Sequence, residues 1–118
     1  DVDVPTAIAR VKEALALEGF GVLGEIDLRA KFQEKLGIDF EEYVILGVCH
    51  PASAYRAVSI EESIGVFLPC NVLVHAVPGG ASIKAIRPAA TLSIVGNPAL
   101  TDVGREVEAQ LERAVAAA

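Results

Sequence analysis

The sequence predicts a two-layer α+β sandwich, with helices mainly on one face of a mixed or antiparallel sheet of four or more strands. Three observations lead to this prediction. Segments of helical periodicity alternate with segments of strand-like alternation, Gly and Pro residues separate these segments, and 53% of the residues are hydrophobic. A chain of 118 residues has the size of one domain, so residues 1–118 are expected to share a single core.

The N-terminal part of the chain is expected to form a helix followed by a strand. Residues 4 to 18 carry apolar side chains at helical spacing, Asp3 can cap the first turn, and Gly19 can end the helix in the left-handed conformation. The next seven residues alternate with a period of two, which predicts a strand with Val22 and Ile26 on the same face.

A second helix is expected over residues 28 to 36. Asp27 can cap this helix, and Gly37 can end it. Three apolar residues stand at positions i, i+4 and i+8, so we expect them to face the core. These residues are Leu28, Phe32 and Leu36.

The remaining elements are arranged around a central strand. Residues 43 to 49 are almost continuously apolar, which is the pattern of a central strand covered on both faces or paired on both sides, and Pro51 suits the first turn of a helix. Because Pro69 cannot donate to a sheet ladder, the following strand is expected over residues 71 to 77. A Pro-Gly-Gly turn then leads to another strand, and an amphipathic helix ends the chain.

Charge and hydropathy argue against nucleic-acid and membrane partners. The formal net charge is −6, the wrong sign for binding phosphates or an anionic membrane surface. The longest apolar-rich stretch, residues 64 to 77, is interrupted by polar residues and a proline, and it is shorter than the roughly 20 residues that span a bilayer. Two cysteines do not make the disulfide framework of a small secreted domain, so we expect a cytoplasmic location.

Cys49 and His50 are the first candidate site residues. They lie at the end of a predicted strand and before a helix N-terminus, where backbone N–H groups and the helix dipole stabilise a thiolate. His50 can exchange a proton near neutral pH, so the two residues are candidates for nucleophile and base. The alternative is that Cys49 packs as a small hydrophobic residue.

Cys70 and Asn71 form a second candidate group. They follow Pro69, which prevents a regular ladder and can aim both side chains toward a cleft; the alternative is that both residues are structural. A redox pair is conceivable if the two cysteine sulfurs meet. Glu25 and Asp27 are a pair of carboxylates that are candidates for acid–base catalysis. The alternative is that Glu25 is an ordinary solvated strand residue.

A zinc site of two cysteines and two histidines is disfavoured by the spacing of its ligands. Cys70 and His75 differ by five positions, so their side chains point to opposite faces of a regular strand. We therefore expect no metal centre, and His50 remains as the candidate for a metal or haem ligand.

Three blocks of the sequence resemble the bacterial and archaeal DUF302 family. They are EGFGVLGEID at residues 18 to 27, YVILGVCHP at residues 43 to 51 and LPCNV at residues 68 to 72. A Gly-Asn-Pro segment before the final helix is also similar to that family. The resemblance implies a small α+β domain that commonly forms dimers, and it implies no established reaction. Family members often carry asparagine where this chain has His50.

These observations leave three hypotheses about function. The first is a small soluble homodimer that binds a small-molecule ligand or partner near Cys49, His50, Cys70, Asn71 and Glu25. One version of it uses the histidine as a haem or metal ligand. The second is a thiol-dependent enzyme with the first cysteine as nucleophile. The third is a structural dimerisation module that pairs through an exposed strand edge.

Overall fold

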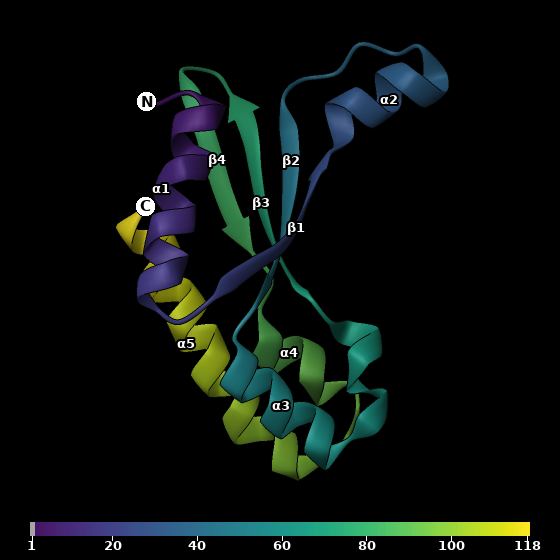
Figure 1. The fold of residues 1–118 in the computed structure, drawn as a ribbon, viewed down its shortest axis with the longest axis vertical. Helices are drawn as coiled ribbons and strands as arrows, with labels where there is room; N and C mark the ends of the chain where they lie inside the picture. The colour runs from purple at the N-terminus through teal and green to yellow at the C-terminus, as the bar shows by residue number, and fades with distance from the viewer. Residues whose placement is uncertain (1) are drawn as a thin grey trace.

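The computed structural model describes residues 2–118. Figure 1 shows an antiparallel sheet with two long helices on one side and a group of short helices at one end. In chain order the elements are α1 (Val4–Leu17), β1 (Gly21–Asp27), α2 (Leu28–Leu36), β2 (Tyr43–Cys49), α3 (Pro51–Ile60), the 3₁₀ helix η1 (Glu62–Phe67), β3 (Cys70–Val77), β4 (Gly80–Ala85), α4 (Pro88–Ser93), the 3₁₀ helix η2 (Pro98–Leu100) and α5 (Thr101–Ala117).

The sheet has four strands in the order β1-β2-β3-β4, and every neighbouring pair is antiparallel. This arrangement confirms the α+β fold class. The strand β2 pairs on both sides, as its apolar run predicts, and it directs Val44, Leu46 and Val48 toward the core. The strand β3 begins at Cys70, directly after Pro69, because the proline cannot donate to the ladder.

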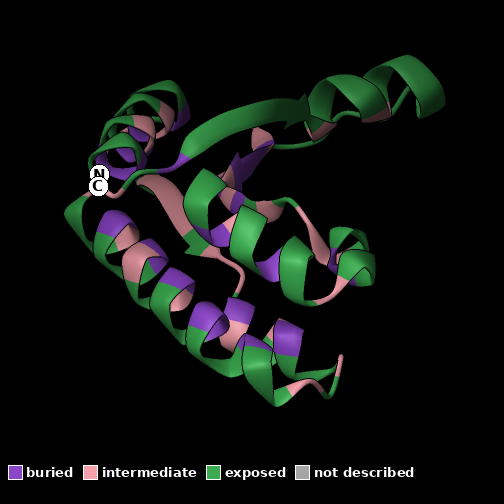
Figure 2. Cartoon of the chain, turned by 60° about the horizontal axis from the view of Figure 1, so that its bottom comes forward, coloured by how far each residue is buried: buried purple, intermediate pink, exposed green. Residues whose placement is uncertain are grey.

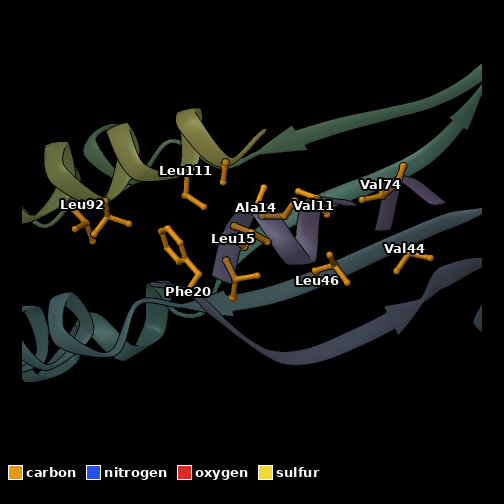
Figure 3. Packing of buried hydrophobic residues seen from close by; sticks show 14 of the residues in the cluster. Val11, Ala14, Leu15, Phe20, Val44, Leu46, Val74, Leu92 and Leu111 are labelled. Carbon is orange, nitrogen blue, oxygen red and sulfur yellow. The ribbon is translucent and has the colours of Figure 1, made fainter. Parts of the chain in front are cut away.

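The core lies between one face of the sheet and the helices α1 and α5. Each helix presents one apolar stripe to this layer, as amphipathic periodicity requires. Figure 3 shows Leu15 of α1 between Leu111 of α5 and Leu46 of β2. All three side chains are almost completely buried.

The prediction for α2 is correct at its ends and wrong about its packing. The Asp27 carboxylate accepts a hydrogen bond from the Ala30 N–H at 3.0 Å, and Gly37 ends the helix with φ +65°. None of the three residues expected to face the core, Leu28, Phe32 and Leu36, is buried. The reason is tertiary: α2 extends beyond the edge of the sheet, where no second layer meets it (Figure 1).

The strand β1 also departs from its predicted alternation. The pairing register shifts between Val22 and Gly24, which places a β-bulge at Leu23. As a result, Val22 pairs with Val48 on the core side of the sheet, whereas Ile26 pairs with Ile45 on the opposite side. The prediction that Val22 and Ile26 share a face is therefore wrong. Figure 2 shows that β1 and α2 are almost entirely exposed.

Candidate functional site

A cavity of about 40 Å³ lies where the ends of β2 and β3 meet the short helices. Its polar lining residues are Cys49, His50, Ser53, Cys70 and Thr91, and most of its apolar lining comes from α3, η1, α4 and α5. The two cysteines, which are 21 positions apart in the sequence, thus border the same space. Both of them are free thiols and half-buried.

Cys49 is the last residue of β2, and α3 begins at Pro51. The predicted placement of Cys49 between a strand end and a helix N-terminus is therefore confirmed. His50 is the N-cap residue of α3, but its side chain makes no capping hydrogen bond. The chain turns sharply here because proline is preorganised for the first helical turn.

Cys70 is the first residue of β3 and pairs across the sheet with Val48, the neighbour of Cys49. Burial raises the pKa of the Cys70 thiol to about 11, and the nearby Cys49 contributes a smaller increase. At pH 7 the Cys70 side chain is therefore almost entirely in the thiol form. Cys70 is consequently a neutral thiol in the cavity wall under neutral conditions.

The His50 ring is held by neighbours on several sides. It packs edge-on against Phe20 with ring centroids 5.3 Å apart, and its Nε2 atom lies 3.4 Å from Nε2 of Gln110. A Cβ atom added at Gly19 would be 2.8 Å from His50 Nε2, so only glycine leaves room for the ring. His50 Nδ1 is buried and has no hydrogen-bond partner within residues 2–118.

This geometry does not assemble the predicted nucleophile–base pair. Neither ring nitrogen of His50 has Cys49 as a hydrogen-bond partner in the described part of the chain. A thiol nucleophile activated by histidine needs such a contact or a rearrangement that creates it. The lining residues instead include two cysteines and a histidine whose Nδ1 atom has no partner within residues 2–118.

The other predicted site residues do not line the cavity. The exposed Asn71 uses its backbone carbonyl to accept a hydrogen bond from the Ile86 N–H at 3.1 Å. Glu25 forms a half-exposed ion pair with Lys12 of α1 at 3.2 Å. The bulge in β1 causes this contact, because it shifts Glu25 to the helix side of the sheet, opposite Leu46.

His75 pairs with Tyr43 in the sheet register, away from the cavity. Across residues 2–118, no group of three or more His, Cys, Asp or Glu side chains is positioned to hold a metal ion. No helix in the same range is long and apolar enough to cross a membrane.

Sequence reasoning missed Ser53 and Gln110. Ser53 is 3% exposed and lines the cavity one helical turn after His50. The helical spacing between these two residues is visible in the sequence and indicates that they share a face. Gln110 reaches His50 from α5, across 60 positions in the sequence. No local pattern indicates that contact, because it depends on how α5 packs beside α3.

The sequence and the fold resemble those of known proteins. A family model described as "Domain of unknown function DUF302" matches residues 1–118. The crystal structure of an uncharacterized conserved protein DUF302 from Bacillus stearothermophilus has 34% sequence identity and a TM-score of 0.91. That alignment covers 98% of this chain and 90% of the other. A comparison with curated proteins found no significant match. The match of the family model over the full length shows that this chain belongs to the DUF302 family.

Proposed function

We propose that this domain binds a ligand of a few non-hydrogen atoms in the cavity that Cys49, His50 and Cys70 line. The observation that supports the proposal is that two separate strand ends contribute polar side chains to one cavity. Well-packed protein cores contain few voids larger than a water molecule. An apolar cavity with a few convergent polar groups is therefore the first position to test for a ligand.

The volume of the cavity restricts the size of the ligand. The cavity measures about 40 Å³, whereas pockets for drug-sized ligands measure roughly 300–1,000 Å³. A water molecule takes up about 30 Å³ in the liquid. The proposal is thus limited to very small ligands. A haem does not fit this space, so we do not retain the haem version of the ligand hypothesis.

The chemistry of the lining favours a neutral ligand. The raised pKa of Cys70 keeps its thiol uncharged at pH 7, and most of the remaining wall is apolar. A charged ligand would lose its hydration without gaining an opposite charge. His50 Nδ1 is buried without a protein partner, so a ligand with one hydrogen-bonding atom can satisfy a group that the protein leaves open.

Xenon is a suitable probe because it occupies apolar cavities in proteins without specific chemistry. We expect pressurised xenon to cause saturable NMR shifts at residues around the cavity in the reduced wild-type protein. Replacing Ala54, which lines the cavity, by leucine fills the space and abolishes those shifts. The matched control is Ala52→Leu, which changes an exposed residue of the same helix and leaves the shifts in place.

Two results would contradict this proposal. One is the absence of saturable xenon shifts around the cavity in the wild-type protein. The other is a set of shifts that Ala54→Leu and Ala52→Leu leave equally intact, because xenon would then occupy a different place.

A second candidate function is a homodimerisation module, and the uncovered face of the sheet supports it. Within residues 2–118 the two long helices α1 and α5 lie on one face of the sheet, and Figure 2 shows no helix over the outer side of β1. The outer face carries Ile26 together with the half-buried Ile45 and Leu73. Several large apolar residues on β1, on α2 and in the loop after it are 37% to 70% exposed. Those on α2 and its loop are Leu36, Ile38 and Phe40. Monomeric proteins rarely leave a large contiguous apolar patch open.

The charges around α2 favour a second copy of this chain as the partner. The helix carries three basic residues and one acidic residue, although the whole chain is acidic. The loop that follows it, residues 37 to 42, carries three acidic residues and no basic residue. In a two-fold dimer the same patch meets itself in reverse, so the basic helix of each copy can lie against the acidic loop of the other.

The oligomeric state tests this second candidate. We expect light scattering to give twice the chain mass at micromolar concentration. Ile26→Lys places a charge on the uncovered face and should give a monomer, whereas Val66→Lys, at a residue of η1 that is 83% exposed, should leave the dimer intact. A monomeric wild-type protein would exclude this role, and so would an Ile26→Lys variant that remains dimeric.

A further inference from the structure

We propose that Cys49 and Cys70 are a redox-active pair that closes to an intramolecular disulfide when a low-molecular-weight disulfide oxidises the folded domain. We further infer that this disulfide regulates ligand binding in the cavity, and that part of the inference rests on the proposed ligand site. The disulfide bond itself can be tested without any ligand. The site would be modified by small disulfide compounds and restored by small thiols.

The sheet register brings the two residues within bonding range. Cys70 lies directly opposite Val48, and Cys49 is one residue further along β2. Opposite Cα atoms in an antiparallel pair are about 4.5–5.5 Å apart, and one residue along a strand adds about 3.4 Å at a right angle. The Cα atoms of Cys49 and Cys70 are thus about 6 Å apart, inside the range of about 4.4–6.8 Å that disulfides span.

The end of β2 lets the two side chains converge. Neighbouring positions on a regular strand point to opposite faces, which would separate Cys49 from Cys70. Cys49 is the last residue of β2, and the chain leaves the sheet at His50 to enter α3. Both cysteines line the same cavity, and Cys49 acts electrostatically on the Cys70 thiol, so the alternation no longer keeps the two thiols apart.

The two thiols have different roles in the exchange. Burial disfavours the Cys70 thiolate by raising the pKa of that thiol, and Cys49 stands directly before the N-terminus of α3, so the exchange starts at Cys49. Its thiolate attacks one sulfur of the small disulfide, the S–S bond of the reagent breaks, and one reagent thiolate leaves and takes up a proton. Cys49 then carries the other half of the reagent as a mixed disulfide.

Cys70 completes the reaction. It loses its proton to solvent and attacks Sγ of Cys49, which forms the Cys49–Cys70 bond and releases the second reagent thiol. Two protein thiols are oxidised, one reagent disulfide is reduced to two thiols, and two electrons pass to the reagent. The product joins the end of β2 to the start of β3 and replaces two free thiols in the cavity lining by one disulfide.

The test treats the reduced wild-type protein with 2-hydroxyethyl disulfide and analyses it without reduction. Trypsin cleaves after Lys35, Arg56 and Lys84, so the cysteines fall in separate peptides, residues 36–56 and 57–84. We expect these two peptides to be joined within one chain and to separate again after dithiothreitol treatment. The Cys70→Ser variant should instead hold a mixed disulfide at Cys49.

The pH dependence provides a readout that mere proximity would not give. Conversion of the mixed disulfide to the internal bond should keep accelerating about tenfold per pH unit up to about pH 10, because it depends on the thiolate fraction of Cys70, whereas a thiol with the usual pKa of 9.0 would level off above pH 9. Unfolding in urea should slow the conversion at least tenfold, since the strand register then no longer holds the thiols together.

Several outcomes would overturn the inference: two mixed disulfides on each chain, cross-links between chains, or no reaction at either thiol. Xenon separates this failure from failure of the ligand site. If the reduced protein binds xenon and the oxidised protein binds it equally well, the bond does not regulate the cavity. If the reduced protein binds no xenon, the ligand proposal fails, whether or not the disulfide forms.

Discussion

Replacing Gly19 by alanine tests how the backbone holds His50 at the cavity. Gly19 has φ +90°, a conformation that costs a residue with a Cβ atom about 1–2 kcal/mol. The added Cβ would also lie 2.8 Å from His50 Nε2, so the ring has to move away from Phe20 and Gln110. Loss of the aromatic contact costs about 0.5–1.5 kcal/mol. The total expected loss in the free energy of unfolding is therefore about 1.5–3.5 kcal/mol.

Gly79→Ala is the matched control for this change. Gly79 has φ +84°, and a Cβ atom added there meets nothing within 4 Å, so the control reports backbone strain alone. Urea denaturation followed by far-ultraviolet circular dichroism measures both variants. Gly19→Ala should be the less stable by about 1 kcal/mol or more, and its His50 NMR signals should move, whereas those of Gly79→Ala should not.

A double-mutant cycle completes the experiment. Truncating His50 to alanine removes the ring that the new Cβ atom meets, so Gly19→Ala should cost less in the His50→Ala background. The reasoning is refuted if Gly19→Ala and Gly79→Ala destabilise the protein equally, within about 0.5 kcal/mol. It is also refuted if the two substitutions in the cycle are additive.

Three further predictions follow from burial, capping and ionisation. The pKa of Cys70 is raised from 9.0 to about 11 in the folded state, so its contribution to stability is complete below pH 9 and is lost as the pH rises to 11; denaturation across this range should show a fall of up to about 3 kcal/mol that Cys70→Ala removes. Leu111→Ala, at a residue 1% exposed in the core, should lower the free energy of unfolding by about 2–5 kcal/mol in urea denaturation; a loss under 1 kcal/mol would contradict the packing. Asp27→Ala removes the cap of a helix without buried residues, so hydrogen exchange should show faster exchange in residues 28–36. Global stability should change by less than about 0.5 kcal/mol, and a larger global loss would mean that α2 belongs to the cooperative core.

Much of the secondary structure was predictable because its signals are local. The side chain of Asp3 accepts a hydrogen bond from the Thr6 N–H at 2.9 Å, and Gly19 adopts positive φ after α1, as their positions in the sequence indicated. The continuous apolar run of β2 correctly indicated a strand paired on both sides. Caps, turns and the apolar period act over three or four residues, so the sequence contains all the interacting groups.

The failures concern the faces that distant elements cover. The apolar spacing of α2 indicated an inward face, but Leu36 is 64% exposed because no layer lies opposite the helix. A single bulge at Leu23 reversed the later positions of β1 and moved Glu25 to the side of α1. Periodicity shows which residues share a face, whereas tertiary packing decides what that face meets.

By itself, the sequence determined the α+β class, the central position of β2 and the placement of Cys49 before a helix N-terminus. Only the tertiary structure decided that Cys49 and Cys70 border one cavity, that Gln110 reaches His50 and that Asn71 and Glu25 lie elsewhere. The physical reason is the separation along the sequence between the groups that interact. Hydrogen bonds of caps and ladders follow from neighbouring residues, whereas a cavity exists where side chains from remote segments fail to fill the space between them.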